Sequence, residues 1–455
     1  MDARTYRARR QELRRNVPHG AILFLGLDEA PRNYAANVYP FRQDSHFLYY
    51  AGISQPDVAL LLTPDGAEIF FGPAADLDTI VWSGPLPSPV ETAARAGVDH
   101  ARDISQLPTA VADLRRSGAP ILYLPPYRAA IAQKLAGLLG RPANEIAAGA
   151  SLDLARAVAR QRSVKSGEEV AEIEAALDVS AAMFRAARAA VRPGRVEAEI
   201  AGAMQAVALA QDCPQAFLPI VTVRGEVLHN NSYHRVMQAG DLLLIDYGAE
   251  SRGGYSADIT RVIPVAGRFD ERQRAIYQVV LDAQLAVIAA ASPRVTNRDL
   301  HFIAARKIAA GLKEIGLMRG DLEEAVQAGA HALFFPHGIG HMLGLDTHDI
   351  EDLGDIVGYP EGEARSTQFG LGFLRLARRL EPGFVVTDEP GVYFNPPLLD
   401  LWETEKRHAE FINYSAARQY LGFGGVRIED DLLITADGCR VLGPGIPKAP
   451  AEIER

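Results

Sequence analysis

The sequence predicts an α/β protein built of two lobes, of which the second is the larger. Two observations support this expectation. Short apolar runs alternate with helix-like stretches through the first third of the chain, and a helix-start signal near residue 166 introduces a second series of strands and helices. The length of 455 residues fits two or three domains at about 150 residues each.

The first lobe is predicted to span residues 1–160. Its clearest feature is a hairpin, in which strands 58–62 and 68–71 flank the turn residues Pro64, Asp65 and Gly66. The other expected elements are strands at 21–25 and 121–124 and helices at 109–116 and 128–139.

The second lobe is predicted to span residues 161–455 and to open with a long helix. Ser166 and Glu169 have the spacing of a capping box, and Pro193-Gly194 ends the helix near residue 192. Further helices are expected at 196–210, 271–290, 298–315 and 322–332. Strands are expected at 242–245 and 255–264, around the glycine-rich turn 248–254, and in the tail 384–435, which the insert 395–422 interrupts.

Composition narrows the function. The net charge of −10 disfavours nucleic acid as a partner, since phosphate binding requires clustered Lys and Arg. Two cysteines, Cys213 and Cys439, cannot build a disulfide framework, which favours a reducing cytoplasm. The first 20 residues contain no apolar signal core, and no stretch approaches the ~20 apolar residues of a membrane span. We therefore expect a cytoplasmic enzyme.

Five residues form the candidate reactive set, each beside an apolar strand or a glycine: Asp246, Asp258, His341, Glu389 and Glu429. Taken singly, each carboxylate is more often a solvated turn or strand residue. Burying these carboxylates together would cost free energy unless a cation neutralised their charges. A set of mainly oxygen ligands with one imidazole suits two hard or borderline divalent cations.

Three histidines also lie close together in a glycine-rich stretch of the sequence. His337, His341 and His348 fall within twelve residues, separated by Gly338, Gly340 and Gly344. One such histidine would more often be an ordinary core or surface residue. The cluster favours metal or substrate binding, because imidazole is the commonest metal ligand and glycine permits close backbone approach.

Five motifs in order resemble the pita-bread metallopeptidase family. They are LIDYG at 244–248, SADITR at 256–261, PHGIGH at 336–341, TDEPG at 387–391 and VRIEDD at 426–431. The run YPFRQDSHF at 39–47 is similar to the amino-terminal domain of aminopeptidase P, which narrows the resemblance to the proline-specific branch, aminopeptidase P and prolidase. The implied fold is a pita-bread catalytic domain preceded by a creatinase/aminopeptidase P-type α/β domain.

The resemblance implies the roles of the metal ligands. Asp246 would chelate one of two divalent ions, Asp258 and Glu429 would bridge both, and His341 and Glu389 would hold the second. Glu389 would also serve as general base for a metal-bridging hydroxide that attacks the peptide carbonyl. Mn²⁺ is the expected metal, with Co²⁺ or Zn²⁺ as alternatives. Asp388 departs from the family pattern, in which a small or apolar residue precedes the metal-binding Glu.

The resemblance also implies residues that touch the substrate. His229, His337 and His348 would line the pocket, with His348 placed to bond the scissile carbonyl or its oxyanion. Arg427 and Arg375 are candidates for orienting a ligand carboxylate or the site's own acids. Tyr393 is a candidate wall for the proline ring, although residues of its kind are more often simply core.

The implied activity is hydrolysis of the Xaa-Pro bond at the amino terminus of short peptides whose second residue is proline. The motif RQDS at 42–45 favours aminopeptidase P, whereas the segments 358–362, 374–378 and 423–426 resemble those of prolidase, which is restricted to dipeptides. A metal-free binding module or creatinase-like hydrolase is a remote alternative, since it would lack several of the five ligands. Relatives imply a homodimer or homotetramer, with Trp82 as a candidate contact.

Overall fold

A computed structural model describes residues 1–74 and 77–454. The chain divides into two compact units, Met1–Arg162 with Ile350–Val357, and Ser163–Asp349 with Gly358–Arg455. The short segment Ile350–Val357 thus belongs to the amino-terminal unit, although its neighbours in sequence on both sides belong to the larger one.

The amino-terminal unit is an α/β fold around one mixed sheet. Its strands are β1 (Ala21–Leu25), β2 (Ala59–Leu62), β3 (Glu68–Gly72), β4 (His100–Asp103) and β5 (Ile121–Leu122). Its helices are α1 (Ala3–Asn16), α2 (Ser45–Ala51), α3 (Leu77–Ser83), α4 (Pro89–Arg95), α5 (Leu107–Arg116), α6 (Ala129–Leu139), α7 (Ala143–Ile146) and α8 (Leu152–Ser163).

The strand order of this sheet is β4-β3-β2-β1-β5, with β4 and β5 parallel to their neighbours and the inner pairs antiparallel. The predicted hairpin is confirmed, because Leu62 pairs with Glu68 across the expected turn. Apolar side chains of the central strands pack with α5 and α6 into the core, including Leu23, Leu61, Phe71, Val111 and Leu135.

In the larger unit the strands lie inside and the helices lie outside. Its strands are β6 (Ile220–Thr222), β7 (Leu242–Tyr247), β8 (Ile259–Pro264), β9 (Val385–Asp388), β10 (Gly391–Tyr393), β11 (Gly425–Arg427), β12 (Asp430–Ile434) and β13 (Cys439–Val441). Its helices are α9 (Gly167–Ala190), α10 (Glu197–Ala210), α11 (Glu271–Ala290), α12 (Asn297–Glu314), α13 (Leu322–Ala328), α14 (Pro396–Thr404), α15 (Tyr414–Arg418) and α16 (Pro450–Ile453).

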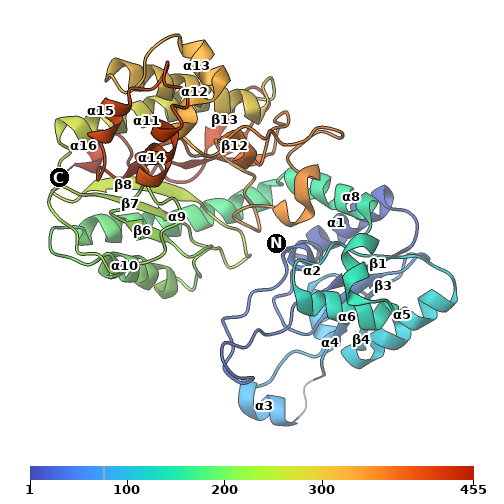
Figure 1. The fold of residues 1–455 in the computed structure, drawn as a ribbon. Coiled ribbons are helices and arrows are strands. Elements are labelled where there is room, and N and C mark those ends of the chain that lie inside the picture. Colours follow the sequence, from blue (N-terminus) through green and yellow to red (C-terminus); the bar gives the residue numbers. More distant parts are fainter. Residues whose placement is uncertain (75–76, 455) are drawn as a thin grey trace. The chain divides into compact units, whose positions relative to one another are not determined.

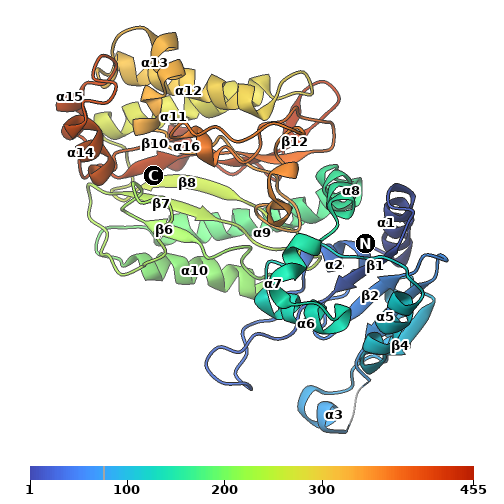
Figure 2. The same ribbon diagram turned by 45° about the vertical axis from the view of Figure 1, so that its right-hand side comes forward.

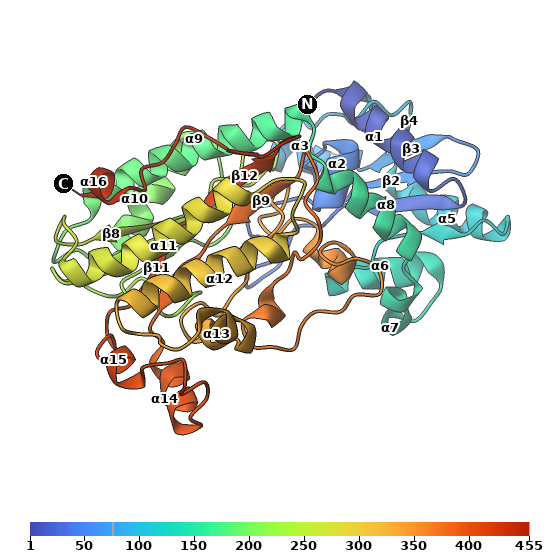
Figure 3. The same cartoon turned by 90° about the horizontal axis from the view of Figure 1, so that it is seen from above.

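Two helix pairs cover the outer faces of these strands. Helices α9 and α10 pack together beside the sheet β6-β7-β8, and α11 and α12 pack together on the side of β9 to β12 (Figures 1 and 2). The view from above shows α11 and α12 running side by side (Figure 3), and α11 packs on β9 and β11. The inner strands are therefore shielded on both sides, which explains their nearly continuous apolar runs.

Local signals in the sequence set several helix boundaries. Ser166 accepts the N–H of Glu169 while the Glu169 side chain bonds back to Ser166, so the capping box at the start of α9 is confirmed. The helix expected at 322–332 ends earlier, at Ala328, because Gly329 adopts φ 84° and caps it in the left-handed region.

The strand expected at 255–264 begins only at Ile259. The backbone just before it is bonded differently: the Asp258 N–H donates to the side-chain Oδ2 of Asp431 at 3.1 Å rather than to a backbone carbonyl of β7. None of the helices in the described residues has the length and apolar character needed to cross a membrane.

Candidate active site

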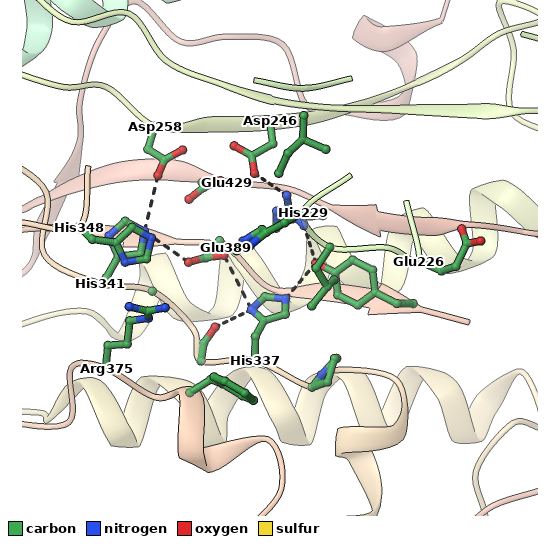
Figure 4. A pocket seen from close by; sticks show the side chains of 18 of the residues that line it. Glu226, His229, Asp246, Asp258, His337, His341, His348, Arg375, Glu389 and Glu429 are labelled. Carbon is green, nitrogen blue, oxygen red and sulfur yellow. Dashed lines mark hydrogen bonds and ion pairs between the residues drawn. The ribbon is translucent and has the colours of Figure 1, made fainter. Parts of the chain in front are cut away.

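Strand ends of the larger unit, together with the loop that carries His341, bring together the five predicted ligands. Figure 4 shows their carboxylates and imidazole pointing toward one another. Asp246 lies on β7, and Asp258 immediately precedes β8, which pairs antiparallel with β7 so that Tyr247 lies opposite Ile259. The two aspartates therefore sit near the same end of the hairpin.

The two glutamates come together through the β9–β12 ladder. Asp388 of β9 lies opposite Asp430 of β12, and Glu389 follows Asp388 in the chain while Glu429 precedes Asp430. Side chains alternate faces along a strand, so Glu389 and Glu429 share the face opposite to that of Asp388 and Asp430.

His341 is fixed against β9 by its backbone. Its N–H donates to Oγ1 of Thr387 at 3.0 Å, and the Thr387 N–H donates to the His341 carbonyl at 3.0 Å. The approach is so close that a Cβ on Gly340 would lie 2.1 Å from the Thr387 oxygen, so only glycine fits there. The glycine beside the histidine thus has a steric function.

The imidazole of His341 is oriented as a ligand. Its Nδ1 lies 3.0 Å from the carbonyl of Met342, an acceptor, so Nδ1 carries the proton and Nε2 presents a lone pair. Nε2 lies 3.5 Å from Oδ2 of Asp258 and 3.7 Å from Oε1 of Glu389. Ligand atoms of Asp258, His341 and Glu429 all lie within 4.8 Å of one another, close enough to hold one metal ion.

Electrostatics favour a cation at this cluster. Burial, followed by the negative charges of neighbouring carboxylates, holds the pKa of Asp258 and of Glu429 well above their usual range. Burial raises the pKa of Glu389 to about 8, against the opposing effect of Arg427. Among the described residues, Oδ1 of Asp246 and Oδ1 of Asp258 are buried without a hydrogen-bond partner. Divalent cations would supply the missing positive charge and the missing partners, so the residues fit a metal centre.

Arg427 links Asp246 to the wall of the pocket. Its guanidinium donates to Oδ2 of Asp246 at 2.6 Å and to the Tyr393 hydroxyl at 2.9 Å. Since Arg427 can only donate, the Tyr393 proton points to Nε2 of His337, 2.9 Å away. Nδ1 of His337 then donates to the carbonyl of Gly338 at 2.8 Å. Burial and the nearby Arg427 charge lower the pKa of His337 to about 3, which agrees with this neutral tautomer.

A single pocket of about 940 Å³ opens over the cluster. Its polar lining includes His229, His348 and Arg375 as well as the metal-binding candidates. Burial, then the charge of Arg427, lowers the pKa of His229. The apolar part of the lining includes Phe217, Leu218, Ile220, Leu228, Leu333, Phe369, Phe373 and Leu398. The pocket thus joins a charged floor to an apolar wall.

The model of metallopeptidase family M24 matches residues 171–436. The chain belongs to this family. The model of the aminopeptidase P amino-terminal domain matches residues 6–123. The expected mixed α/β fold, a pita-bread domain preceded by an aminopeptidase P-type domain, is confirmed by these matches and by the likeness to solved structures of aminopeptidase P.

The proteins similar to this M24 protein fall under two enzyme names, Xaa-Pro aminopeptidase and Xaa-Pro dipeptidase. A probable Xaa-Pro aminopeptidase of Penicillium rubens is 34% identical over 427 residues, covering 91% of this chain and 88% of the relative. Human Xaa-Pro dipeptidase is 41% identical over 220 residues, which span 48% of this chain but only 43% of that protein. The structure of zinc-substituted Escherichia coli aminopeptidase P in complex with product superposes with a TM-score of 0.81 and 29% identity, covering 100% of this chain and 97% of that chain.

Several residues of this M24 site escaped sequence reasoning. Thr260 joins two candidates, because its hydroxyl donates to Glu429 at 2.6 Å and accepts from Arg427 at 3.1 Å. Thr387 bonds the His341 backbone, and Asp431 accepts the Asp258 N–H. All three lie two residues from a motif carboxylate, but nothing in the sequence shows which groups they bond. The apolar lining at 217–218 and 369–373 carries no motif either.

Proposed function

We propose that this protein is an Xaa-Pro aminopeptidase, a metalloexopeptidase that hydrolyses the bond between the first residue and a proline in second position. The observation that carries the proposal is the joint presence of the acid–histidine cluster under the pocket and an aminopeptidase P-type amino-terminal domain in one chain. The similarity to a named Xaa-Pro aminopeptidase over 91% of the chain supports it.

In this proposal two divalent cations occupy the carboxylate cluster. Asp246, Asp258, His341, Glu389 and Glu429 would hold them. Mn²⁺ is the proposed metal because the ligand set is rich in oxygen, with Co²⁺ or Zn²⁺ as alternatives. When bound, such cations lower the pKa of a coordinated water and so supply a nucleophile near neutral pH.

The chain's own residues bind and orient the peptide. Glu389 accepts a proton from the attacking water at its carboxylate and passes it on to the nitrogen of the leaving proline. His348, which lines the pocket beside His341, donates a hydrogen bond to the scissile carbonyl and to the negative charge that develops on it. His229 and His337 line the pocket as neutral imidazoles. Arg375, also in the pocket lining, attracts the negatively charged end of the substrate.

Arg427 and Tyr393 act on the site's own groups in this proposal. Arg427 orients Asp246, and Tyr393 connects Arg427 with His337. The Tyr393 ring also lines the pocket, where it offers an apolar surface to the pyrrolidine. An Xaa-Pro bond is a tertiary amide without an N–H and with a fixed φ, so recognition by an apolar wall replaces the missing hydrogen bond.

The second candidate is an Xaa-Pro dipeptidase, favoured by the 41% identity with the human protein over 220 residues. That likeness covers less than half of either chain, and the pocket volume of about 940 Å³ lies at the upper end of the ~300–1,000 Å³ typical of ligand sites. A tripeptide Xaa-Pro-Yaa and a dipeptide Xaa-Pro, compared with Mn²⁺ present, test the choice. The aminopeptidase requires faster turnover of the tripeptide; hydrolysis of the dipeptide alone would favour the second candidate.

Self-association in the cytoplasm, as a homodimer or homotetramer, completes the proposal. Helix α3 buries none of its residues, and it exposes Leu77, Val81 and Trp82, of which Trp82 is 86% exposed. Large exposed apolar side chains grouped together are typical of interaction sites. Sedimentation equilibrium of the wild type and of Trp82→Ser tests this point: a monomeric wild type would contradict it.

A further inference from the structure

Two oppositely charged residues are buried beside the loop that carries His348, outside the metal cluster. Nζ of Lys165 donates to Oδ2 of Asp349 at 2.8 Å, and both side chains are 1% exposed. Asp349 directly follows His348 in the chain. Neither residue of this ion pair has a role in the function proposed above.

Asp349 closes the loop that carries His348. Its N–H donates to the carbonyl of Met342 at 2.9 Å, and its Oδ1 accepts the N–H of Asp346 at 3.2 Å. The loop 342–349 is thereby folded back on itself, with His341 just before it and His348 near its end. The two imidazole rings stack, with centroids 3.8 Å apart. The carboxylate of Asp349 therefore controls the shape of the loop and, through it, the position of the His348 ring.

Lys165 is a fixed point for this carboxylate. Its N–H donates to the carbonyl of Gly383 at 2.8 Å, and the next residue, Ser166, caps the 24-residue helix α9. The ion pair also packs tightly against the loop. A Cβ on Gly344 would lie 2.5 Å from Oδ2 of Asp349 and 2.9 Å from Cε of Lys165. The pair thus ties the loop to the rigid start of α9.

The residue after Asp349 has a strained backbone. Ile350 adopts φ 67°, a left-handed conformation that β-branched residues rarely take. Such conformations persist only where the surrounding structure imposes them, and they cluster at functional sites. Asp349, the acidic partner of the ion pair, lies immediately before this strained residue.

We propose that Lys165, acting through Asp349, is a positioning residue for His348. A buried ion pair adds little net stability over an apolar pair of the same volume, because both charges lose their hydration. The hydrogen bonds of such a pair are directional, however, so they fix the positions of the groups that they join. The Lys165–Asp349 pair holds loop 342–349 in the shape that keeps the His348 ring stacked on His341 and directed to the pocket. The catalytic consequence rests on the role of His348 in the proposed function.

The first test is a double-mutant cycle on an Xaa-Pro-Yaa tripeptide. Lys165→Met should lower kcat about 10- to 100-fold with a smaller change in KM, as expected when a transition-state contact is misplaced. In a His348→Ala background the same substitution should have little further effect on kcat, because the ring it positions is gone. Multiplicative losses in the double variant would overturn the proposal.

Two further variants distinguish an effect on the stability of the protein from an effect on the position of the His348 ring. Lys165→Met/Asp349→Asn removes both charges, so it should recover much of the melting temperature lost in Lys165→Met while kcat stays low. Recovery of kcat together with stability would show a purely structural pair and overturn the proposal. Glu68→Gln is the matched control, since Glu68 bonds the buried Arg10 in the amino-terminal unit at 2.8 Å. It should retain wild-type kcat.

A readout without substrate tests the geometry alone. In protein with ¹⁵N-labelled histidine, the His348 ring signal is assigned by its loss in His348→Gln. It should shift or broaden in Lys165→Met and stay unchanged in Glu68→Gln. An unmoved His348 signal would overturn the proposal even if activity fell. If the wild type hydrolyses no Xaa-Pro peptide, the proposed function fails, and this spectrum still decides whether Lys165 positions the ring.

Discussion

The imidazole rings of His341 and His348 lie parallel and in contact, with their planes inclined by only 12°. One histidine faces the carboxylate cluster and the other lines the pocket next to it. A candidate metal ligand thus supports the ring proposed to contact the substrate, so the two functions are adjacent in space as they are in sequence.

The His348 ring is expected to act on catalysis more than on metal binding. His348→Ala should lower kcat by about 100-fold or more, which corresponds to the loss of one oxyanion donor, while metal content stays near that of the wild type. Steady-state kinetics and metal analysis of the same preparation measure the two effects. An equal loss of metal and of kcat would assign His348 a structural role instead.

Removal of metal should make stability depend on pH. Burial raises the pKa of Glu389 from its ordinary 4.5 to about 8, so the folded metal-free protein holds this proton more tightly than the unfolded chain. The resulting stability is fully present below pH 4.5 and is lost as the pH rises to 8. The melting temperature of chelated protein should therefore fall over this range.

Added divalent cation should remove most of that fall, because it stabilises the ionised carboxylates. Calorimetric scans of chelated and Mn²⁺-loaded protein at several pH values test this expectation. Glu389→Gln should reduce the fall in the chelated protein, and the raised pKa values of Asp258 and Glu429 account for the part that remains. Identical pH profiles with and without metal would argue against a cation at this cluster.

Arg427 should not be replaceable by lysine. Its guanidinium bonds Thr260, Tyr393 and Asp246 at once, a fork that a single ammonium group cannot reproduce. We expect Arg427→Lys to lower kcat or metal affinity by about 10- to 100-fold without loss of folding. Isothermal titration with Mn²⁺ measures metal affinity, steady-state kinetics measure kcat, and circular dichroism measures folding. Wild-type affinity together with wild-type kcat would refute this account of Arg427.

Asp388 is expected to destabilise the protein. It is fully buried on β9, and among the described residues neither of its carboxylate oxygens has a hydrogen-bond partner. Asp388→Val keeps a similar volume and suits a strand, so the free energy of unfolding should rise by about 1–3 kcal/mol.

The opposite residue of the same ladder provides the control for Asp388. Asp430 bonds Arg261 at 2.6 Å and also Gln284 and Lys448. Asp430→Val should therefore destabilise by about 3–5 kcal/mol, because it leaves a buried guanidinium uncompensated. Urea unfolding of both variants measures the change in the free energy of unfolding. A loss of stability in Asp388→Val would mean that the Asp388 carboxylate has hydrogen-bond partners after all.

The sequence by itself determined the two-lobed α/β class, the capping box of α9, the β2–β3 hairpin and the family, because each depends on local spacing or on ordered motifs. It also supplied the candidate ligands Asp246, Asp258, His341, Glu389 and Glu429. Only the tertiary structure decided which atoms face which. The tautomer of His337, the bonds of the threonines and the Lys165–Asp349 pair depend on contacts between segments far apart in the chain. Thr260 bonds Glu429 and Arg427, and Thr387 bonds the backbone of His341. Such contacts are fixed by packing and strand register, which no single stretch of sequence encodes.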